Sequence, residues 1–416
     1  MVCRTSLDGV QRKFQCTNYL LLHNYNYNHY PAQTAMPTQI PQLPLEIAME
    51  ILSRLPIKPL LRFKSVSKSC YSLISTNPQF SELHLKRALQ DTDLIRYRLF
   101  LTSFLPQSLD MEEAFCDGHK NLVTRQHSFP VTDPESLHFE FVGSCNGLIC
   151  GLFDSDGKII VWNPTTGESR ELLKPDSVTG DHKILFHGFG YDFRLDDYKL
   201  ARATHSSSTN QLKMEIFNLK ENVWRSADNV LQFNYLLEGS SVALNGVLYW
   251  LVYQRDSTKH AIYSFDLVKE KYREIVIVPD HISENLGGEF LVSSLKILGS
   301  SLCICYHAES FAMWVANGYG SEACWAKLFS FSSELLPEYG DPLHVLWVAK
   351  NGNVILIVDA CRIVIYNPIE MSSKDFYIES CPFGIQTSVD SISYMETFVS
   401  PNAHIHPSIS SCSKIF

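Results

Sequence analysis

The sequence LPLEIAMEILSRLPIKPLLRFKSVSKSC at residues 43–70 sets the start of the fold, because its apolar residues recur at helical spacing. One stripe repeats every four positions and predicts an amphipathic helix. Its members are Leu43, Ile47, Ile51 and Leu55. Pro44 suits the first turn of this helix, and Pro56 ends it, since proline lacks the backbone N–H that a helix interior needs.

Two more short helices and a last helical turn are predicted after Pro56. The second helix starts near Pro59, and the third ends at the turn Asn77-Pro78. Their apolar residues are Leu60, Phe63, Val66, Tyr71, Leu73 and Ile74, and the last turn carries Phe80, Leu83 and Leu85. A module of this size is near the limit at which one core is stable by itself. We therefore expect another protein to cover part of its apolar surface.

The composition of the 416-residue chain is that of a folded protein with about two to three domains. A net charge of −9 argues against non-specific nucleic-acid binding, which needs a basic face. No apolar run approaches the roughly 18 residues of a membrane helix, so neither nucleic acid nor membrane is an expected partner. The twelve cysteines are scattered without Cys-x-x-Cys pairs. This favours reduced thiols in the cytoplasm and/or the nucleus.

After an acidic, weakly patterned connector, the chain becomes strand-like. Asn-Gly turns before apolar strands recur, as at Asn146-Gly147 and Asn245-Gly246. Aromatic residues near strand ends recur at positions 162, 217, 265, 314 and 366, at intervals of 55, 48, 49 and 52 residues. A repeat of about 50 residues with several turn signals is typical of a kelch-like propeller blade. A pair of β-sandwiches with coincidental spacing is the alternative.

These patterns predict an α+β multidomain fold, in which a small N-terminal three-helix module precedes a mainly β kelch-like propeller. The first 39 residues are rich in Asn, Tyr, His and Gln and show no apolar period, which indicates a disordered tail. The expected boundaries are this tail at 1–39, the helical module at 40–88, the connector at 89–135, the β domain at 136–400 and a second tail at 401–416.

The helical segment from Leu43 to Lys68 resembles a plant F-box. The remainder resembles the F-box-associated domain of the same plant proteins, of the S-locus F-box or F-box/kelch-repeat type. The motifs that carry this second resemblance are Ser144-Cys145-Asn146-Gly147-Leu148, Trp162-Asn163-Pro164-Thr165-Thr166, Gly188-Phe189-Gly190-Tyr191-Asp192 with Asp197-Tyr198-Lys199, and Trp314 with Tyr319-Gly320 and Trp325-Ala326-Lys327-Leu328-Phe329. The resemblance implies that the helical module docks on a Skp-family adaptor, which links it to a cullin and a ubiquitin-conjugating enzyme.

By this resemblance, eight residues would supply the adaptor-docking surface or hold it in shape as internal core. They are Leu43, Pro44, Ile47, Ile51, Leu55, Pro56, Leu60 and Phe63. One position departs from the family pattern, since Cys70 stands where a Trp is usual. Losing that ring costs about 3 to 5 kcal/mol of packing if nothing compensates. Tyr71 is the residue expected to take up part of the space.

Charge is unevenly divided along the chain. Residues 43–89 carry seven basic and three acidic side chains, a net +4, so the rest of the chain carries −13. A basic module would speed encounter with an acidic adaptor more than it would tighten the complex. A solvated helix face explains any single lysine equally well. An acidic β domain likewise favours a basic target protein.

The sequence contains no complete catalytic or cofactor motif, and no cofactor or metal is expected. The segment 154–157 begins like a calcium loop, but the fifth and twelfth positions lack the required ligands, so a hairpin turn is expected. Gly188-Phe189-Gly190 lacks the third glycine of a dinucleotide-binding fingerprint. Cys303 and Cys305 have no second pair at zinc spacing. They are expected to be small buried apolar residues.

The sequence therefore predicts a non-catalytic substrate-recognition subunit of an SCF-type E3 ubiquitin ligase, whose β domain binds a target protein for ubiquitination and degradation. Specificity is expected in loops at one propeller face, in the stretches 173–186, 203–212, 228–240 and 280–290. Two alternatives stay open, an F-box scaffold that acts outside a ligase and a propeller hydrolase. The hydrolase would need acidic or nucleophilic groups that converge in the central channel.

Overall fold

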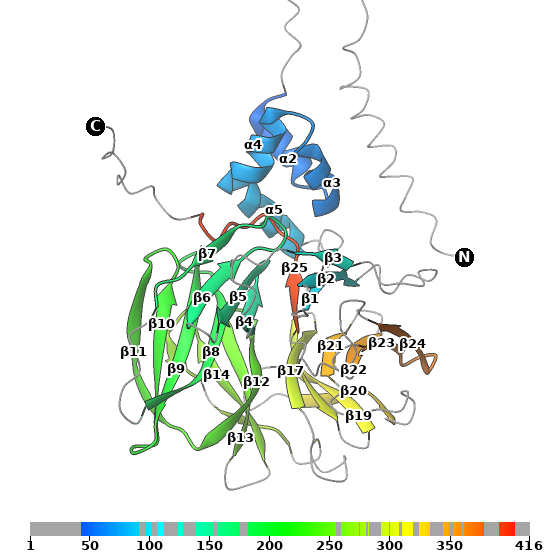
Figure 1. Ribbon diagram of the computed structural model, residues 1–416. Helices are drawn as coiled ribbons and strands as arrows, with labels where there is room; N and C mark the ends of the chain where they lie inside the picture. Colours follow the sequence, from blue (N-terminus) through cyan, green and yellow to red (C-terminus); the bar gives the residue numbers. More distant parts are fainter. Residues whose placement is uncertain are drawn as a thin grey trace, which may run out of the picture. The chain divides into compact units, whose positions relative to one another are not determined.

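Figure 1 shows the computed structural model of the protein. It describes residues 43–403 except for a series of internal segments. These segments are 91–96, 102–105, 112–123, 128–138, 154–156, 175–181, 255–258, 274, 280–281, 283–292, 299, 308–309, 319–323, 333–343, 349–352, 359–361 and 378–390. The predicted tail at 1–39 therefore lies outside the described residues, as does most of the tail at 401–416.

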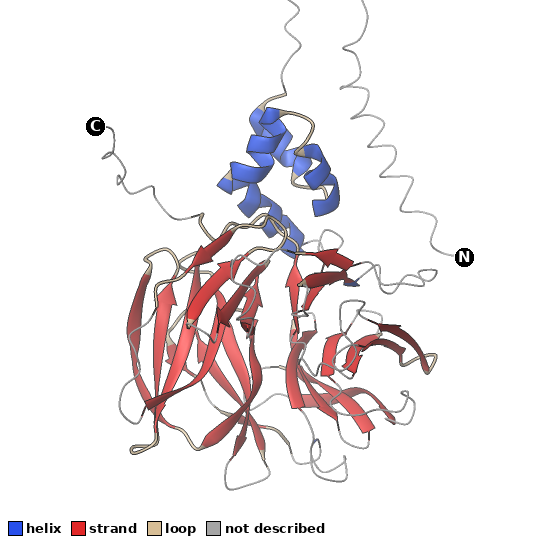
Figure 2. Ribbon diagram, viewed as in Figure 1, coloured by secondary structure: helices blue, strands red, loops and turns tan. Residues whose placement is uncertain are grey.

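The chain divides into two units between Ala48 and Met49. The boundary falls within helix α2 (Leu45–Leu52), so the second unit contains the end of α2, the remaining helices and all described strands (Figure 2). The remaining helices are α3 (Ile57–Phe63), α4 (Lys68–Thr76) and α5 (Pro78–Gln90). The three predicted helices are thus present. None of the described helices is long and apolar enough to cross a membrane.

Side-chain caps set where the last two helices begin. Ser67 precedes α4, and its hydroxyl accepts a hydrogen bond from the backbone N–H of Cys70 at 3.0 Å. The side-chain oxygen of Asn77 accepts from the backbone N–H of Phe80 at 3.0 Å in the first turn of α5. α5 has 13 residues, so the prediction of a single helical turn here was wrong. Its buried residues lie four positions apart, at Phe80, His84 and Ala88.

The described strands form six antiparallel sheets, which are the six blades of a β-propeller. Five blades are consecutive in the chain and are numbered here in chain order. The first blade consists of β4 (Phe139–Cys145), β5 (Leu148–Phe153), β6 (Lys158–Trp162) and β7 (Ser169–Glu171), and the second of β8 (His182–Asp192), β9 (Asp197–Ser206), β10 (Gln211–Asn218) and β11 (Val223–Gln232). The third consists of β12 (Tyr235–Leu244), β13 (Val247–Gln254), β14 (His260–Asp266), β15 (Lys271–Tyr272) and β16 (Val276–Ile277), the fourth of β17 (Ser293–Leu298), β18 (Ser301–His307), β19 (Ser310–Asn317) and β20 (Cys324–Ser332), and the fifth of β21 (His344–Val348), β22 (Val354–Val358), β23 (Arg362–Asn367) and β24 (Ser372–Tyr377). This confirms the predicted propeller, and the alternative of two β-sandwiches was wrong.

The sixth blade joins the two ends of the β domain. β25 (Ser391–Met395) pairs with β1 (Tyr97–Leu101), which continues to β2 (Gln107–Asp110) and β3 (Thr124–Gln126). Figure 1 shows β25, in red, beside β1. Residues 89–135 were expected to be a connector, yet they hold three of these four strands. β1, β2 and β3 follow one another in the chain, but their partner β25 lies at its far end, so the local sequence does not show that these strands belong to a complete blade.

The repeat in the sequence corresponds to the third strand of successive blades. Its aromatic residues are Trp162 in β6, Phe217 in β10, Phe265 in β14, Trp314 in β19 and Tyr366 in β23. The Asn-Gly turns join the first and second strands, as predicted. In the first blade the φ angles of Asn146 and Gly147 are 51° and 87°. Both lie in the left-handed region that this hairpin turn requires.

Strand connections leave the propeller at two opposite faces, because consecutive antiparallel strands reverse direction. The turn face, as named here, carries the connections between the first and second and between the third and fourth strands of a blade. The loop face carries the remaining connections, including those from blade to blade. The predicted specificity stretches 203–212 and 228–240 reach the loop face but consist mostly of β9 to β12. Residues 175–181 of the stretch 173–186 and all of 280–290 except Ile282 lie outside the described residues, and 182–186 belong to β8.

Candidate protein-docking surface

Helix α2 exposes its apolar face. None of its eight residues is buried, although the segment LEIAMEIL is mostly apolar. Ile47 and Ile51, one helical turn apart, are 47% and 48% exposed, and Leu43 before the helix is 56% exposed. Isolated exposed apolar residues are normal, but a continuous apolar run on one helix marks a contact site for another molecule.

The eight residues predicted for adaptor docking divide into three groups by burial. Leu43, Pro44, Ile47 and Ile51 are exposed, and Leu55, Pro56 and Phe63 are partly buried. Leu60 is completely buried, so it supports the helices from inside and offers no surface. Between the starts of α2 and α5, three large apolar residues outside the predicted set are also exposed, Leu45, Val66 and Tyr71. Their exposure could not be inferred from the four-residue stripe, because none of them lies on it.

Arg87 of α5 holds the end of α2 in place. Its guanidinium donates to the carbonyl oxygen of Glu50 at 2.8 Å and to the hydroxyl of Ser53 at 2.5 Å, and it also pairs with the Glu50 carboxylate. Arg54 binds the other oxygen of this carboxylate at 2.5 Å. Hydrogen bonds from Arg54 and Arg87 hold the pKa of Glu50 below its ordinary value. The exposed residue Ile51 is therefore carried by a helix end that has a defined position in the second unit.

His84 of α5 ties the same helix to the α2–α3 junction. Its Nε2 lies 3.0 Å from the carbonyl oxygen of Leu55, and since a carbonyl only accepts, Nε2 carries the proton. Burial lowers the pKa of His84, although the hydrogen bond to Leu55 acts in the opposite direction. His84 is thus neutral at physiological pH. Within the described residues, its Nδ1 is buried without a hydrogen-bond partner.

The position that departs from the family pattern lies on α4. Cys70 is partly buried and its thiol is free. Tyr71, expected to fill the space of the missing ring, is 55% exposed, with the Lys64 ammonium 5.8 Å from its ring centroid. The expectation that Tyr71 fills this space was therefore wrong, because more than half of the residue is exposed to solvent. Leu73 and Ile74 are the buried residues of α4.

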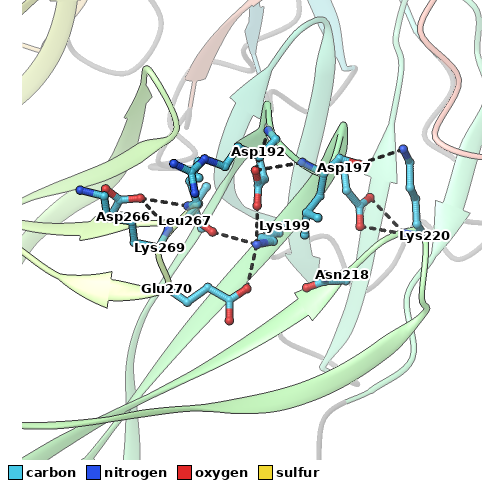
Figure 3. A network of polar contacts seen from close by, with 12 residues as sticks. Asp192, Asp197, Lys199, Asn218, Lys220, Asp266, Leu267, Lys269 and Glu270 are labelled. Carbon is cyan, nitrogen blue, oxygen red and sulfur yellow. Dashed lines mark hydrogen bonds and ion pairs between the residues drawn. The ribbon is translucent and has the colours of Figure 1, made fainter.

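The motif around Lys199 stabilises the turn face between the second and third blades (Figure 3). The Lys199 ammonium is fully buried and donates to Asp192 at 2.6 Å, Glu270 at 2.7 Å and the carbonyl oxygen of Leu267 at 2.8 Å. Burial alone would raise the pKa of Asp192, but hydrogen bonds from Lys199 and from two backbone N–H groups hold it below its ordinary value. These family-motif residues therefore join two blades and are not available to a partner.

The motif around Asn163 stabilises the segment that follows β25. The Asn163 side-chain amide donates to the carbonyl oxygens of Thr397 at 3.1 Å and Val399 at 2.7 Å. Its oxygen accepts from the backbone N–H of Thr165 at 2.8 Å and so closes the turn after β6. A Cβ at Gly147 would lie 2.1 Å from the Thr397 hydroxyl, so this position requires glycine. This motif serves ring closure.

A serine–histidine contact in the sixth blade is the arrangement most like a catalytic pair. Ser108 Oγ lies 2.7 Å from His127 Nε2 and accepts a hydrogen bond from Arg98 Nε at 2.9 Å. Burial, with smaller effects of Arg125 and Arg98, lowers the pKa of His127 to about 4. A histidine with that pKa is a weak base, and Ser108 is completely buried. The contact is therefore a structural hydrogen bond, because a substrate could not reach the Ser108 hydroxyl.

The two thiols considered as metal ligands are part of a core. Cys303 and Cys305 are 0% and 2% exposed and pack with apolar residues of the fourth and fifth blades. Burial raises the pKa of each to about 12, so both are protonated. This confirms them as small buried apolar residues. The described residues contain no cluster of three or more side chains that could hold a metal ion. β5 and β6 pair antiparallel on either side of the turn expected at 154–157, of which residues 154–156 lie outside the described residues.

Comparison with known families finds two matches along the chain. The F-box domain matches residues 40–81, and the F-box associated β-propeller domain matches residues 96–400. The second match begins next to β1 and ends just after β25, so its bounds agree with the six blades.

Individual relatives agree with these matches. An F-box/kelch-repeat protein of Arabidopsis thaliana is 27% identical over 373 residues, which cover 86% of this chain and 96% of the relative. F-box protein CPR1 of the same plant is 28% identical over 368 residues, or 82% of this chain and 85% of the relative. Among solved structures, a periplasmic gluconolactonase of Pseudomonas aeruginosa aligns with a TM-score of 0.39 at 10% identity, over 69% of this chain and 84% of that one.

Proposed function

The chain belongs to the family of F-box proteins with an F-box-associated β-propeller domain, and from this premise we propose that it is the substrate-recognition subunit of an SCF-type ubiquitin ligase. F-box domains generally bind Skp1-type adaptors, and the combination with a propeller fits a substrate-recognition subunit. In this proposal the adaptor connects the protein to a cullin, the propeller binds a target protein for degradation, and the complex works in the cytoplasm and/or the nucleus.

The observation that carries the proposal is the exposed apolar face of α2 inside the F-box match. Burial of a large aliphatic side chain contributes about 1.5 to 3 kcal/mol, so covering Ile47, Ile51 and Leu45 would supply a substantial part of a binding free energy. An adaptor with an apolar groove of matching length is the partner that this helix requires. The net +4 of residues 43–89 would speed encounter with an acidic adaptor.

The proposed role of the propeller is to hold a target and not to react with it. Ubiquitin transfer would then gain from proximity and orientation, supplied by a rigid scaffold. The loop face is the proposed target surface, because its connections are free of the motif residues that close the ring on the turn face. The net charge of −13 outside the helical module favours a basic target.

Replacing Ile51 by aspartate tests the adaptor-docking proposal. Ile51→Asp places a charge in the apolar interface, so we expect the affinity for a recombinant Skp-family adaptor to fall at least tenfold, about 1.4 kcal/mol. The matched control is Ile369→Asp on the propeller, where the side chain is 81% exposed. Calorimetric titration with purified adaptor measures both affinities. The proposal would be contradicted if wild type and Ile51→Asp bound the adaptor equally well, or if the wild type did not bind it.

Cullin co-purification distinguishes a ligase subunit from a scaffold that acts outside a ligase. Tagged wild-type protein should recover both adaptor and cullin from plant cells, and Ile51→Asp should recover neither. Recovery of adaptor without cullin would favour the scaffold. The hydrolase alternative is not favoured by any contact described above, since the Ser108–His127 pair is closed to substrate.

A further inference from the structure

A short segment after β25 connects the last blade to the first. This closing segment, Glu396–Asn402, receives two hydrogen bonds from the Asn163 amide, at its residues Thr397 and Val399. The Thr397 hydroxyl donates in turn to the carbonyl oxygen of Asn146 at 2.9 Å. Two further bonds join this segment to β7: the Arg170 guanidinium donates to the carbonyl oxygen of Pro401 at 3.5 Å, and the Asn402 side-chain amide donates to the carbonyl oxygen of Ser169 at 3.3 Å. The closing segment is therefore held by propeller groups on both sides of Phe398.

Phe398 carries the closing segment's contact with the helices. Its side chain is only 4% exposed, and its ring lies 6.3 Å from the ring of Phe80 and 5.7 Å from that of His84, between ring centroids. The His84 and Phe398 planes meet at 71°, an edge-to-face arrangement that aromatic pairs favour. The Lys64 ammonium lies 5.8 Å from the Phe398 centroid. The ring thus packs among residues of α5 and the α3 end while its backbone belongs to the propeller.

A second apolar contact lies two helical turns from Phe80 on α5. Ala88 packs against Met395, the last residue of β25, with both side chains buried and Leu85 beside them. α5 also holds the end of α2 through Arg87 and the α2–α3 junction through His84. α5 is therefore in contact both with the C-terminal end of α2, the helix proposed to bind the adaptor, and with β25, the strand that closes the propeller.

The helices are attached to the propeller in two ways, by the chain connection from α5 to β1 and by the packing of α5 against Met395 and Phe398. A single chain connection between α5 and β1 would let the helices swing about it, whereas a packed contact from the opposite end of the sequence removes that freedom. We propose that Phe398 is a positioning residue that fixes the F-box helices to the propeller and so sets where a bound target stands relative to the ubiquitin donor. The role in ubiquitin transfer rests on the proposed function; the coupling of the two parts does not.

Distance measurements between spin labels test the coupling directly. Labels attached through unnatural amino acids at Ser69 on α4 and Ile369 on the propeller report the separation without using native thiols, since both positions are exposed. Double electron–electron resonance should give one narrow distance distribution for the wild type and a distribution at least twice as wide for Phe398→Ala. Phe193→Ala, which removes a 62% exposed ring, should match the wild type.

Circular dichroism and thermal melting of each variant show whether it is folded. Phe398→Leu keeps an apolar side chain but loses the ring contacts, so it should give an intermediate width, and it carries the test if Phe398→Ala does not fold. An unchanged narrow distribution in the folded Phe398 variants, or a broad one in the wild type, would overturn the coupling.

The consequence for ubiquitin transfer is read from the receptor's own lysines. In a ligase reconstituted with adaptor, neddylated cullin and conjugating enzyme, mass spectrometry should find ubiquitin on a few propeller lysines of the wild type. Phe398→Ala should spread the modification over more positions, with adaptor affinity unchanged within twofold. The same lysine pattern in both proteins would overturn the positioning role. If the wild type did not bind the adaptor, the proposed function would be contradicted instead, and the spin-label result would still hold.

Discussion

The ammonium of Lys199 is fully buried and has three oxygen partners, which come from the second and third blades. Removing the ammonium leaves the buried Asp192 carboxylate without its ion-pair partner and the Leu267 carbonyl without its hydrogen bond from Lys199, which costs about 3 to 5 kcal/mol. An exposed ion pair is worth less than about 1 kcal/mol, because water replaces the lost partner. Burial thus decides which lysines of the turn face matter for stability.

Lys199→Met is expected to lower the free energy of unfolding by about 3 to 5 kcal/mol, since the carboxylate of Asp192 stays buried without its partner. The matched control is Lys220→Met, which removes an ion pair to Asp196 of 3.0 Å at a site with much more solvent. That control should cost less than about 1 kcal/mol. Urea denaturation followed by tryptophan fluorescence measures both values. Similar losses in the two variants would contradict the assignment of Lys199 as a structural clamp.

Hairpin turns that look alike in sequence differ in what surrounds them. Gly147 and Gly157 both have positive φ, 87° and 65°, and both precede the second strand of a hairpin. A Cβ at Gly147 would lie 2.1 Å from the Thr397 hydroxyl and 2.7 Å from the Met395 carbonyl oxygen, whereas a Cβ at Gly157 would meet nothing within 4 Å. Only the first turn is also a packing surface for the closing segment.

Gly147→Ala should therefore destabilise the propeller more than Gly157→Ala. Both substitutions cost about 1 to 2 kcal/mol of backbone strain in the left-handed region. The clash at Gly147 adds about 1 to 3 kcal/mol, because a well-packed site must shift to accept the methyl group. Thermal melting of the two variants measures the difference. Equal melting temperatures would show that the closing segment does not pack on this turn as described.

The stability of the whole propeller depends on histidines that are kept neutral by burial. Burial, with a smaller effect of Arg202, lowers the pKa of His187 to about 4, and the pKa of His127 is also about 4. An unfolded histidine titrates near 6.5. Between pH 6.5 and pH 4 the unfolded chain therefore binds protons that the folded chain does not, and stability falls as the pH falls.

The free energy of unfolding is expected to decrease below pH 6.5 by about 1.4 kcal/mol per pH unit for each of these histidines. Urea denaturation at pH 7.5, 6.0 and 5.0 measures this slope. The double variant His127→Gln with His187→Gln cannot bind these protons and should show a smaller slope over the same range. A stability that does not change between pH 6.5 and pH 4.5 would contradict partly buried, neutral side chains at both positions.

Helix α2 shows how far a local sequence pattern can predict the proposed adaptor-docking site. The four-residue stripe identified Ile47 and Ile51, which are exposed, because helical spacing is a local property of the chain. The family resemblance placed Leu60 in the same docking set, yet Leu60 is completely buried. Burial depends on which other helices pack against a face, and for Leu60 no local spacing records that.

The sequence by itself determined the helical module, the propeller repeat and the Asn-Gly turns, since helical period, strand period and turn residues are all set by neighbours in the chain. Only the tertiary structure decided that β1, β2 and β3 form a blade, that Lys199 joins two blades and that Phe398 reaches α5. Each of these depends on partners far away in sequence. β25 and Phe398 meet their partners only when the two ends of the β domain come together, and Lys199 needs the next blade to pack beside its own. A local pattern records neither event.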